Sequence, residues 1–194
     1  MNIGTKLMKR RLFTATLVLV LSGCAGQQTP SSKDPAQQIY DVAMEDLSDG
    51  LYPEAHKGFN KVKSRYPYSS FARLAVLRIS DTHFAQGKYD EAIDAYSRFI
   101  KYHPLHEEVA YATLRIGDSY YERIPKDWWF LPPSAEKDQG YVRLAIDGFR
   151  DVIKLYPKSE HATVAAERLK QCRAKLAAHE MYVANFYFDR DKPK

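Results

Sequence analysis

Apolar and polar positions along this chain follow the spacing of helices rather than of strands. Over residues 70–86 the large apolar side chains recur on one side of a predicted helix. They are Phe71, Leu74, Leu77, Ile79 and Phe84. A longer helical pattern runs without interruption from Ser159 to about Asp189. The hydrophobic pattern therefore predicts an all-α fold.

A motif with fixed internal spacing occurs three times. Each copy has Gly, then Tyr or Val, Ala, an aromatic residue, a further Tyr or His, and Pro. The copies are Gly50-Tyr52-Ala55-Phe59-Tyr66-Pro67, Gly87-Tyr89-Ala92-Tyr96-His103-Pro104 and Gly140-Val142-Ala145-Phe149-Tyr156-Pro157. Similarity of this kind indicates stacked supersecondary units.

The residue types in this motif predict a helix–turn–helix unit. Gly ends the first helix with a positive φ angle, Ala allows two helices to approach closely, and Pro stops the second helix. The segment from Gly87 to Ala92 is similar to the tetratricopeptide motif G-x-Y-x-E-A. We expect a tetratricopeptide-type α-solenoid over 36–190. An unrelated helical bundle is the alternative, but it would not need Gly, Ala and Pro in register.

The predicted repeats cover about 36–67, 70–104 and 106–157, with a partial repeat over 159–190. The third repeat carries an insert, 125–140, at its helix–helix turn. The insert contains Trp128, Trp129 and Phe130, and its prolines disfavour a regular helix. These rings either fold back on the solenoid as a lid or form a contact site for a partner, since Trp is enriched at interface hot spots.

The C-terminal part of the pattern lacks the features that close such an array. Ala177 stands where the period predicts Gly, and a short tail, 191–194, follows. Val183, Phe186, Tyr187 and Phe188 do not make the polar cap of a terminal repeat. We therefore expect an incomplete array, completed either by further chain or by another subunit.

Residues 1–23 have the layout of a secretory signal peptide, with basic residues before an apolar run over 12–21. The run is shorter than the about 20 residues that a membrane-spanning helix needs. Its end, Leu21-Ser22-Gly23-Cys24, resembles the lipobox of bacterial lipoproteins. The resemblance implies cleavage before Cys24 and a covalent lipid on its thiol. The Gln, Ser, Thr and Pro residues that follow indicate a flexible linker over 24–35. An ordinary signal or anchor with an incidental cysteine is the alternative.

The formal charge of +5 comes mostly from the predicted signal peptide. Without Lys6, Lys9, Arg10 and Arg11 the chain carries +1, so nothing argues for nucleic-acid binding. Cys172 would have no disulfide partner, and its helical pattern predicts a buried thiol. The sequence has no catalytic motif, because His106-Glu107-Glu108 and His179-Glu180 lack the second His of a zinc-binding H-E-x-x-H. We expect no enzyme, no metal and no cofactor other than the lipid.

The lipobox and the repeats together resemble the BamD family, the tetratricopeptide lipoproteins of the outer-membrane β-barrel assembly machinery. The matching segments are Tyr66-Pro67-Tyr68-Ser69, Arg98-Phe99-Ile100, His103-Pro104, Tyr156-Pro157-Lys158-Ser159 and 176–187. The resemblance implies a scaffold at the outer membrane that faces the periplasm. Its implied partners are the barrel-inserting subunit, other assembly lipoproteins and unfolded outer-membrane proteins. Ala25, after the lipidated cysteine, also favours the outer membrane.

First-helix positions of such arrays line a groove for partner segments. Projected onto this chain, they are Tyr40, Met44, Leu47, Leu77, Asp81, Phe84, Tyr111, Leu114, Asp118 and Tyr121. Several of these side chains could instead pack against neighbouring helices. Arg190 is a further possible partner contact by its position. A pilus-secretin pilot and a cell-envelope or division adaptor remain alternative functions, both of them also binding proteins.

Overall fold

The structure is a computed structural model that describes residues 34–126 and 133–190. Its helices are α1 (Pro35–Ser48), α2 (Tyr52–Arg65), α3 (Ser70–Ala85), α4 (Tyr89–Tyr102), α5 (Val109–Glu122), the 3-10 turn η1 (Ser134–Glu136), α6 (Gly140–Leu155) and α7 (Glu160–Arg190). The all-helical prediction is confirmed. None of the described helices is both long enough and apolar enough to cross a membrane.

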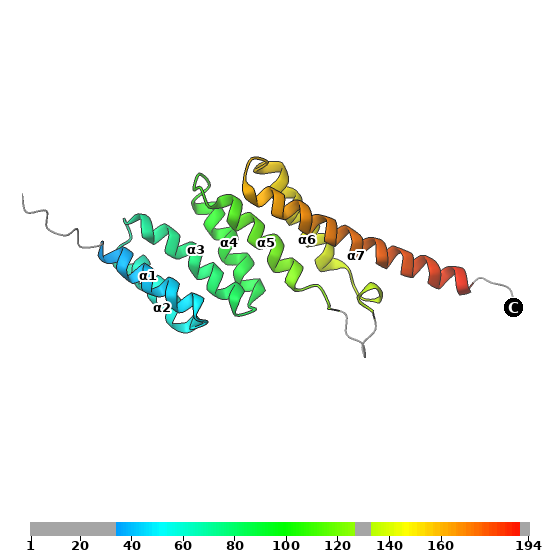
Figure 1. The fold of residues 1–194 in the computed structure, drawn as a ribbon, viewed down its shortest axis with the longest axis horizontal. Helices are drawn as coiled ribbons and strands as arrows, with labels where there is room; N and C mark the ends of the chain where they lie inside the picture. Colours follow the sequence, from blue (N-terminus) through cyan, green and yellow to red (C-terminus); the bar gives the residue numbers. More distant parts are fainter. Residues whose placement is uncertain (1–33, 127–132, 191–194) are drawn as a thin grey trace, which may run out of the picture. The chain divides into compact units, whose positions relative to one another are not determined.

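The helices pack in chain order, each against the next, from α1 through α7. In addition α1 touches α3, and α5 touches α7, so the first helices of successive pairs meet. Figure 1 shows the resulting row of antiparallel helices. This nearest-neighbour packing is the defining property of a solenoid.

The turns inside the first two pairs have the predicted glycine geometry. Gly50 has a φ of 77° and Gly87 a φ of 73°, a region that suits residues without a Cβ. The prediction is wrong for Gly140, which is the first residue of α6 instead of the end of a helix. The insert separates Gly140 from α5, which ends at Glu122, so no tight turn has to be closed there.

The second helix of each pair ends in the same way. Tyr66, His103 and Tyr156 follow the last helical residues with φ near −130° and ψ near 52°, because the next residue is Pro and disfavours helical backbone before it. Two of the following helices, α3 and α7, begin on side-chain caps. Ser69 Oγ accepts from the amide of residue 71 at 3.2 Å, and Ser159 Oγ from that of residue 161 at 3.2 Å.

Small residues bring the two helices of a pair into close contact. A Cβ added to Gly58 in α2 would lie 2.6 Å from the Cβ of Ala43 in α1. In the third pair, a Cβ on Gly148 would lie 2.9 Å from the Cα of Gly117. Ala95 holds the repeat position of Gly58 in the second pair, 37 residues later, and is also buried. Close approach therefore depends on this position as well as on the predicted alanines.

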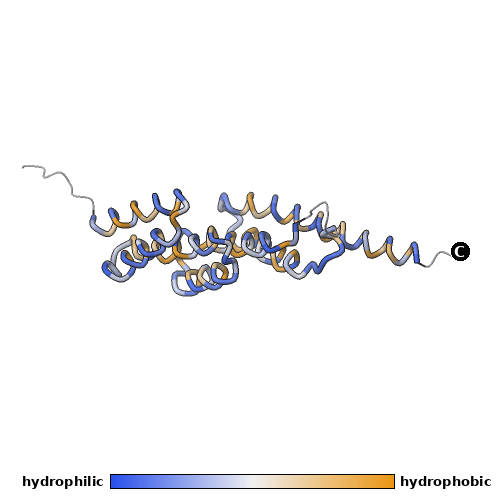
Figure 2. The backbone as a smooth tube through the Cα atoms, turned by 90° about the horizontal axis from the view of Figure 1, so that it is seen from below, coloured by the Kyte–Doolittle hydropathy of each residue, from blue (hydrophilic) through white to orange (hydrophobic). Residues whose placement is uncertain are grey.

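The core divides into three clusters, each centred on one helix pair. The repeat aromatics Phe59, Tyr96 and Phe149 are fully buried, one in each cluster. Figure 2 shows apolar positions recurring between polar ones along every helix. Cys172 is buried as predicted, and burial raises the pKa of its thiol to about 11. The thiol is therefore protonated at neutral pH and unreactive.

The described end of the insert packs on α7. His179 Nδ1 donates to the carbonyl oxygen of Ala135 at 2.6 Å. The buried Gln139 amide donates to the carbonyl oxygens of Ser134 and Lys137 at 2.9 and 2.7 Å. Trp128, Trp129 and Phe130 lie outside the described residues. The lid and the partner-contact interpretations therefore both stay predictions.

Acid is expected to destabilise the fold through two histidines between α2 and α3. The His56 and His83 rings lie 5.3 Å apart. Burial lowers the pKa of both imidazoles, helped by the charge of Lys63 at His56 and by the interaction with His56 at His83. The unfolded chain, with pKa about 6.5, then binds more protons than the native state. Stability is present above about pH 6.5 and is lost as the pH falls through the lower folded pKa.

Urea unfolding at about pH 7.5 and about pH 5.5 measures this dependence. The midpoint should be lower at the acid pH. A His56→Gln/His83→Gln variant should show a smaller decrease, with His103, whose pKa burial also lowers, still contributing. An unchanged pH dependence in the double variant would contradict the assignment.

Candidate functional site

An Arg-x-x-Asp motif repeats along the first helices of the array. Arg78 and Asp81 lie in α3, and Arg115 and Asp118 lie 37 residues later in α5. When the residues of the insert are added to the 37-residue period, Arg168 of α7 falls at the same repeat position as Arg78 and Arg115. We call the three arginines Arg78, Arg115 and Arg168 the arginine ladder. We call the surface formed by the arginine ladder together with helix α1 the first-helix face.

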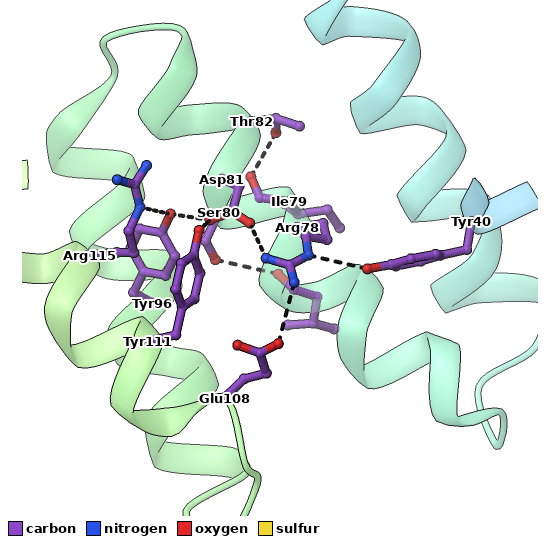
Figure 3. Close-up of polar contacts among 11 residues, drawn as sticks. Tyr40, Arg78, Ile79, Ser80, Asp81, Thr82, Tyr96, Glu108, Tyr111 and Arg115 are labelled. Atoms are coloured by element: carbon purple, nitrogen blue, oxygen red, sulfur yellow. Dashed lines mark hydrogen bonds and ion pairs between the residues drawn. The ribbon is translucent and has the colours of Figure 1, made fainter. Parts of the chain in front are cut away.

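The first arginine connects three repeats (Figure 3). Arg78 Nη1 donates to Asp81 Oδ2 at 2.7 Å within α3. Its Nε donates to the Tyr40 hydroxyl of α1 at 3.2 Å, and its Nη2 to Glu108 Oε1, before α5, at 3.4 Å. A single guanidinium thus holds the first helices together, as its planar fork of donors allows.

Asp81 is the acceptor at the centre of this network. Its Oδ1 accepts from the Tyr96 hydroxyl at 2.5 Å and from the Tyr111 hydroxyl at 3.0 Å. Burial alone would lower the pKa of Arg78, but hydrogen bonding to Asp81 and its charge outweigh burial and raise that pKa. The Arg78 guanidinium is therefore charged at all physiological pH values. The Arg78–Asp81 pair is a structural centre as well as part of the first-helix face.

The second and third arginines stack on aromatic rings of the preceding repeat. The Arg115 guanidinium lies 3.6 Å from the centroid of Phe84, and that of Arg168 lies 5.0 Å from Tyr121. Both approach Asp118, with Arg115 Nη1 at 3.3 Å from Oδ2 and Arg168 Nε at 3.9 Å from Oδ1. Cation–π stacking and charge together fix the spacing between repeats on this face.

Asp118 is less completely satisfied than Asp81. Its Oδ1 is buried without a hydrogen-bond partner. Burial raises the pKa of this carboxyl, in spite of the nearby guanidinium groups of Arg115 and Arg168. In residues 34–126 and 133–190 no three His, Cys, Asp or Glu side chains are grouped so that they could hold a metal ion. The face offers rings, guanidinium edges and carboxylate oxygens, which suits recognition of a segment of another chain.

The structure divides the ten predicted groove residues into two sets. Leu77, Leu114 and Asp81 are 0%, 5% and 8% exposed, so they belong to the interior and do not form an open surface. Tyr40 is also buried, against Phe59 and Phe71. The remaining six lie partly exposed along α1, α3 and α5: Met44, Leu47, Phe84, Tyr111, Asp118 and Tyr121.

The arginine ladder is the part of the site that sequence reasoning missed. Its signal is present, because Arg78 and Arg115 recur at the same 37-residue period as the glycines. Arg190 is exposed at the end of α7, with its guanidinium 5.7 Å from the Phe186 ring centroid. Cys24 and the predicted cleavage residues Leu21, Ser22 and Gly23 lie outside the described residues.

The fold and this face define a helical-repeat protein of the tetratricopeptide class. The Yersinia enterocolitica type III secretion chaperone SycD has a TM-score of 0.54 at 19% identity, covering 74% of this chain and 96% of that one. The first tetratricopeptide domain of Spaghetti (RPAP3) has a TM-score of 0.51 at 16% identity, covering 73% and 93%. At such identities the similarity concerns the fold alone.

The chain belongs to the YfiO family of outer membrane lipoproteins, whose model matches residues 32–194. The outer membrane protein assembly factor BamD of Caulobacter vibrioides is 29% identical over 92% of this chain. BamD of Pasteurella multocida is 25% identical over 95%. The chain spans 58% of the length of the first relative and 71% of the second. The predicted family resemblance is confirmed, and the relatives that the chain matches are named as outer membrane protein assembly factors.

Proposed function

We propose that the chain is a lipid-anchored scaffold of the outer-membrane β-barrel assembly machinery. It binds the barrel-inserting subunit and other assembly lipoproteins, holds unfolded outer-membrane proteins, and faces the periplasm from the outer membrane. The anchor is a lipid on Cys24, exposed by cleavage after Leu21-Ser22-Gly23. The observation that carries the proposal is the family match over 32–194, with relatives named as assembly factors.

The first-helix face is proposed as the surface that holds client segments. Its partly exposed apolar side chains are Met44 and Leu47 on α1 and Phe84 on α3, and α5 adds the partly exposed rings of Tyr111 and Tyr121. Apolar anchors with a few directed polar groups suit a peptide segment that brings its own large side chains. The arginine ladder adds donors for carboxylates and backbone carbonyls along the same line. The Arg168 side chain, 39% exposed, is the most accessible of the three.

The end of α7 is proposed as the contact for the barrel-inserting subunit. Large apolar side chains stand exposed over its last three turns. They are Met181, Phe186, Tyr187 and Phe188, with exposed fractions from 49% to 68%. Arg190 closes this surface and offers a charged contact at its rim. Trp128, Trp129 and Phe130 stay a second predicted partner contact.

Affinity purification from detergent-solubilised outer membranes tests the assignment. The tagged lipoprotein should recover a large β-barrel protein with periplasmic domains. A Phe186→Ser/Tyr187→Ser variant should lower that recovery about tenfold or more, since aromatic side chains dominate such interfaces. Asn185→Ser, exposed in the same helical turn, is the matched control and should leave recovery unchanged.

The client surface is tested with the same preparation by crosslinking to an unfolded outer-membrane protein. Arg168→Ala should weaken the crosslink, whereas Arg173→Ala, at an exposed position of the same helix, should not. Recovery of only a secretin, or only of division proteins, would contradict the assembly function. Those outcomes would favour the pilot or the adaptor.

A further inference from the structure

The antiparallel stacking gives the array two distinct edges. Asp34, where α1 begins, lies on the same edge as the turns 66–69, 103–108 and 156–159, which connect successive pairs. We call this the tether edge, because the N-terminal segment joins the array here. The turns inside the first two pairs, at 49–51 and 86–88, lie on the far edge, as do the described residues 123–126 and 133–139 between α5 and α6. Figure 1 shows the tether edge along the top of the row and the far edge along the bottom.

The tether edge carries the most exposed large apolar side chains of the described chain. Tyr68 is 97% exposed and Leu105 98%, and they hold the same repeat position in the first two connecting turns. Tyr102 and Leu155, the last residues of α4 and α6, are 69% and 59% exposed. Scattered exposed apolar residues are ordinary on protein surfaces. These four exposed apolar side chains, however, lie on one edge, two by two at equivalent positions of successive repeats, so they form an aligned set of apolar tips.

Basic residues surround these tips. The edge residues 34–37, 62–73, 99–112 and 152–163 include six exposed cations, namely Lys63, Arg65, Arg73, Lys101, Lys154 and Lys158. The same ranges hold four carboxylates, Asp34, Glu107, Glu108 and Glu160, of which Glu108 is paired with Arg78. Apolar tips among cations match the chemistry of an anionic membrane–water interface, where Tyr rings and basic side chains concentrate.

The far edge has the opposite character. Carboxylates predominate among its described residues, 45–55, 82–92, 119–126 and 133–143. They are Glu45, Asp46, Asp49, Glu54, Asp90, Glu91, Glu122, Glu136 and Asp138, against Lys88, Arg123, Lys126, Lys137 and Arg143. An anionic lipid surface would repel this edge. The charge asymmetry therefore selects one edge, and it is the edge to which the anchored segment is connected.

We propose that the tether edge rests on the headgroup region of the membrane that holds the lipid anchor. The proposal depends on the lipid on Cys24. Asp34 stands ten positions after Cys24, so this end of the tether edge stays within about 35 Å of the anchored residue. Tethering converts a weak surface contact into an intramolecular one with a high effective concentration. Four apolar tips and six cations are then enough to set the orientation.

This docking determines how the helices, the arginine ladder and the end of α7 are oriented relative to the membrane. The helices run from edge to edge, so they stand on the bilayer, and the row of pairs runs along it. The arginine ladder then lies parallel to the membrane surface. α7 begins at the tether edge and is 31 residues long, so its last turns lie away from the lipid. In Figure 1 they project past the other helices at the right.

Depth-dependent fluorescence quenching tests the orientation on the full lipidated chain. The protein is reconstituted in vesicles of phosphatidylethanolamine and phosphatidylglycerol that contain a headgroup nitroxide lipid. A polarity-sensitive fluorophore is attached at one new cysteine, either Ser70→Cys or Glu107→Cys on the tether edge. Asp49→Cys and Lys88→Cys on the far edge are the matched controls, and all four positions are exposed. Cys172 is buried and stays unlabelled.

The tether-edge labels should be quenched at least about twofold more than the far-edge labels, because quenching decreases steeply with distance. Adding Tyr68→Ser/Leu105→Ser should remove most of this difference. Equal quenching at the two edges of vesicle-bound protein would overturn the edge docking and leave the anchor standing. Flotation tests the anchor separately. If Cys24→Ser floats with vesicles as well as the unaltered chain, the lipid anchor fails, and the docking proposal fails with it.

Discussion

Replacing Asp81 with alanine is expected to lower the free energy of unfolding by about 3–5 kcal/mol. The carboxylate accepts from Arg78, Tyr96 and Tyr111, and its side chain is only 10% exposed. Without it, the Arg78 guanidinium keeps its charge in a half-buried position and two hydroxyl groups lose their acceptor. Urea unfolding followed by circular dichroism measures the loss.

The chain offers a matched control for this variant. Asp147 pairs with Arg150 three residues away, as Arg78 pairs with Asp81, but these side chains are 69% and 57% exposed. Asp147→Ala should cost less than about 1 kcal/mol. Asp81→Asn should fall between the two, since its amide oxygen still accepts one hydroxyl. Equal losses for Asp81→Ala and Asp147→Ala would show that the network contributes little to stability.

Replacing Gly148 with alanine is the second change expected to have a large effect. The new Cβ would lie 2.9 Å from the Cα and 3.3 Å from the N of Gly117, and backbone atoms cannot turn aside as a flexible side chain can. Overpacking of this kind costs about 1–3 kcal/mol, against a gain of up to about 1 kcal/mol in helix propensity. We expect a net loss of stability and a lower melting temperature.

Asp151→Ala serves as the control for Gly148→Ala. It lies in the same helix at an exposed position, and the change should stay within about 0.5 kcal/mol. Thermal melts of the two variants and the unaltered chain, at equal concentration, decide the matter. A Gly148→Ala variant that melts at or above the temperature of the unaltered chain would mean that α5 and α6 separate without cost.

The fold could be predicted from the sequence because it is built from local signals. Glycines with positive φ, prolines after the second helices, and the buried aromatics Phe59, Tyr96 and Phe149 each act within one helix pair. Repetition then extends the local rule along the row. Where the rule was interrupted, prediction failed. Gly140 is the last residue of the insert and begins a helix instead of ending one.

The candidate site was predicted less well, because it forms between repeats. The helical pattern placed Leu77 and Leu114 correctly on first helices but could not tell that they face the core. Arg78 and Arg115 were overlooked, although they recur with the period of the repeat. Their role depends on Tyr40, Phe84 and Tyr96, which stand in other helices, so no single helix contains the information.

The sequence by itself determined the helix pairs and their order, since these follow from spacing along the chain, and its motifs resemble those of the family to which the chain belongs. Only the tertiary structure decided which first-helix residues are buried, that Asp81 collects donors from three helices, and that Tyr68 and Leu105 share one edge with Asp34. Each of these facts depends on distances between segments brought together by packing. Periodicity along a chain specifies the faces of its helices, whereas burial and charge pairing are set by what those faces meet.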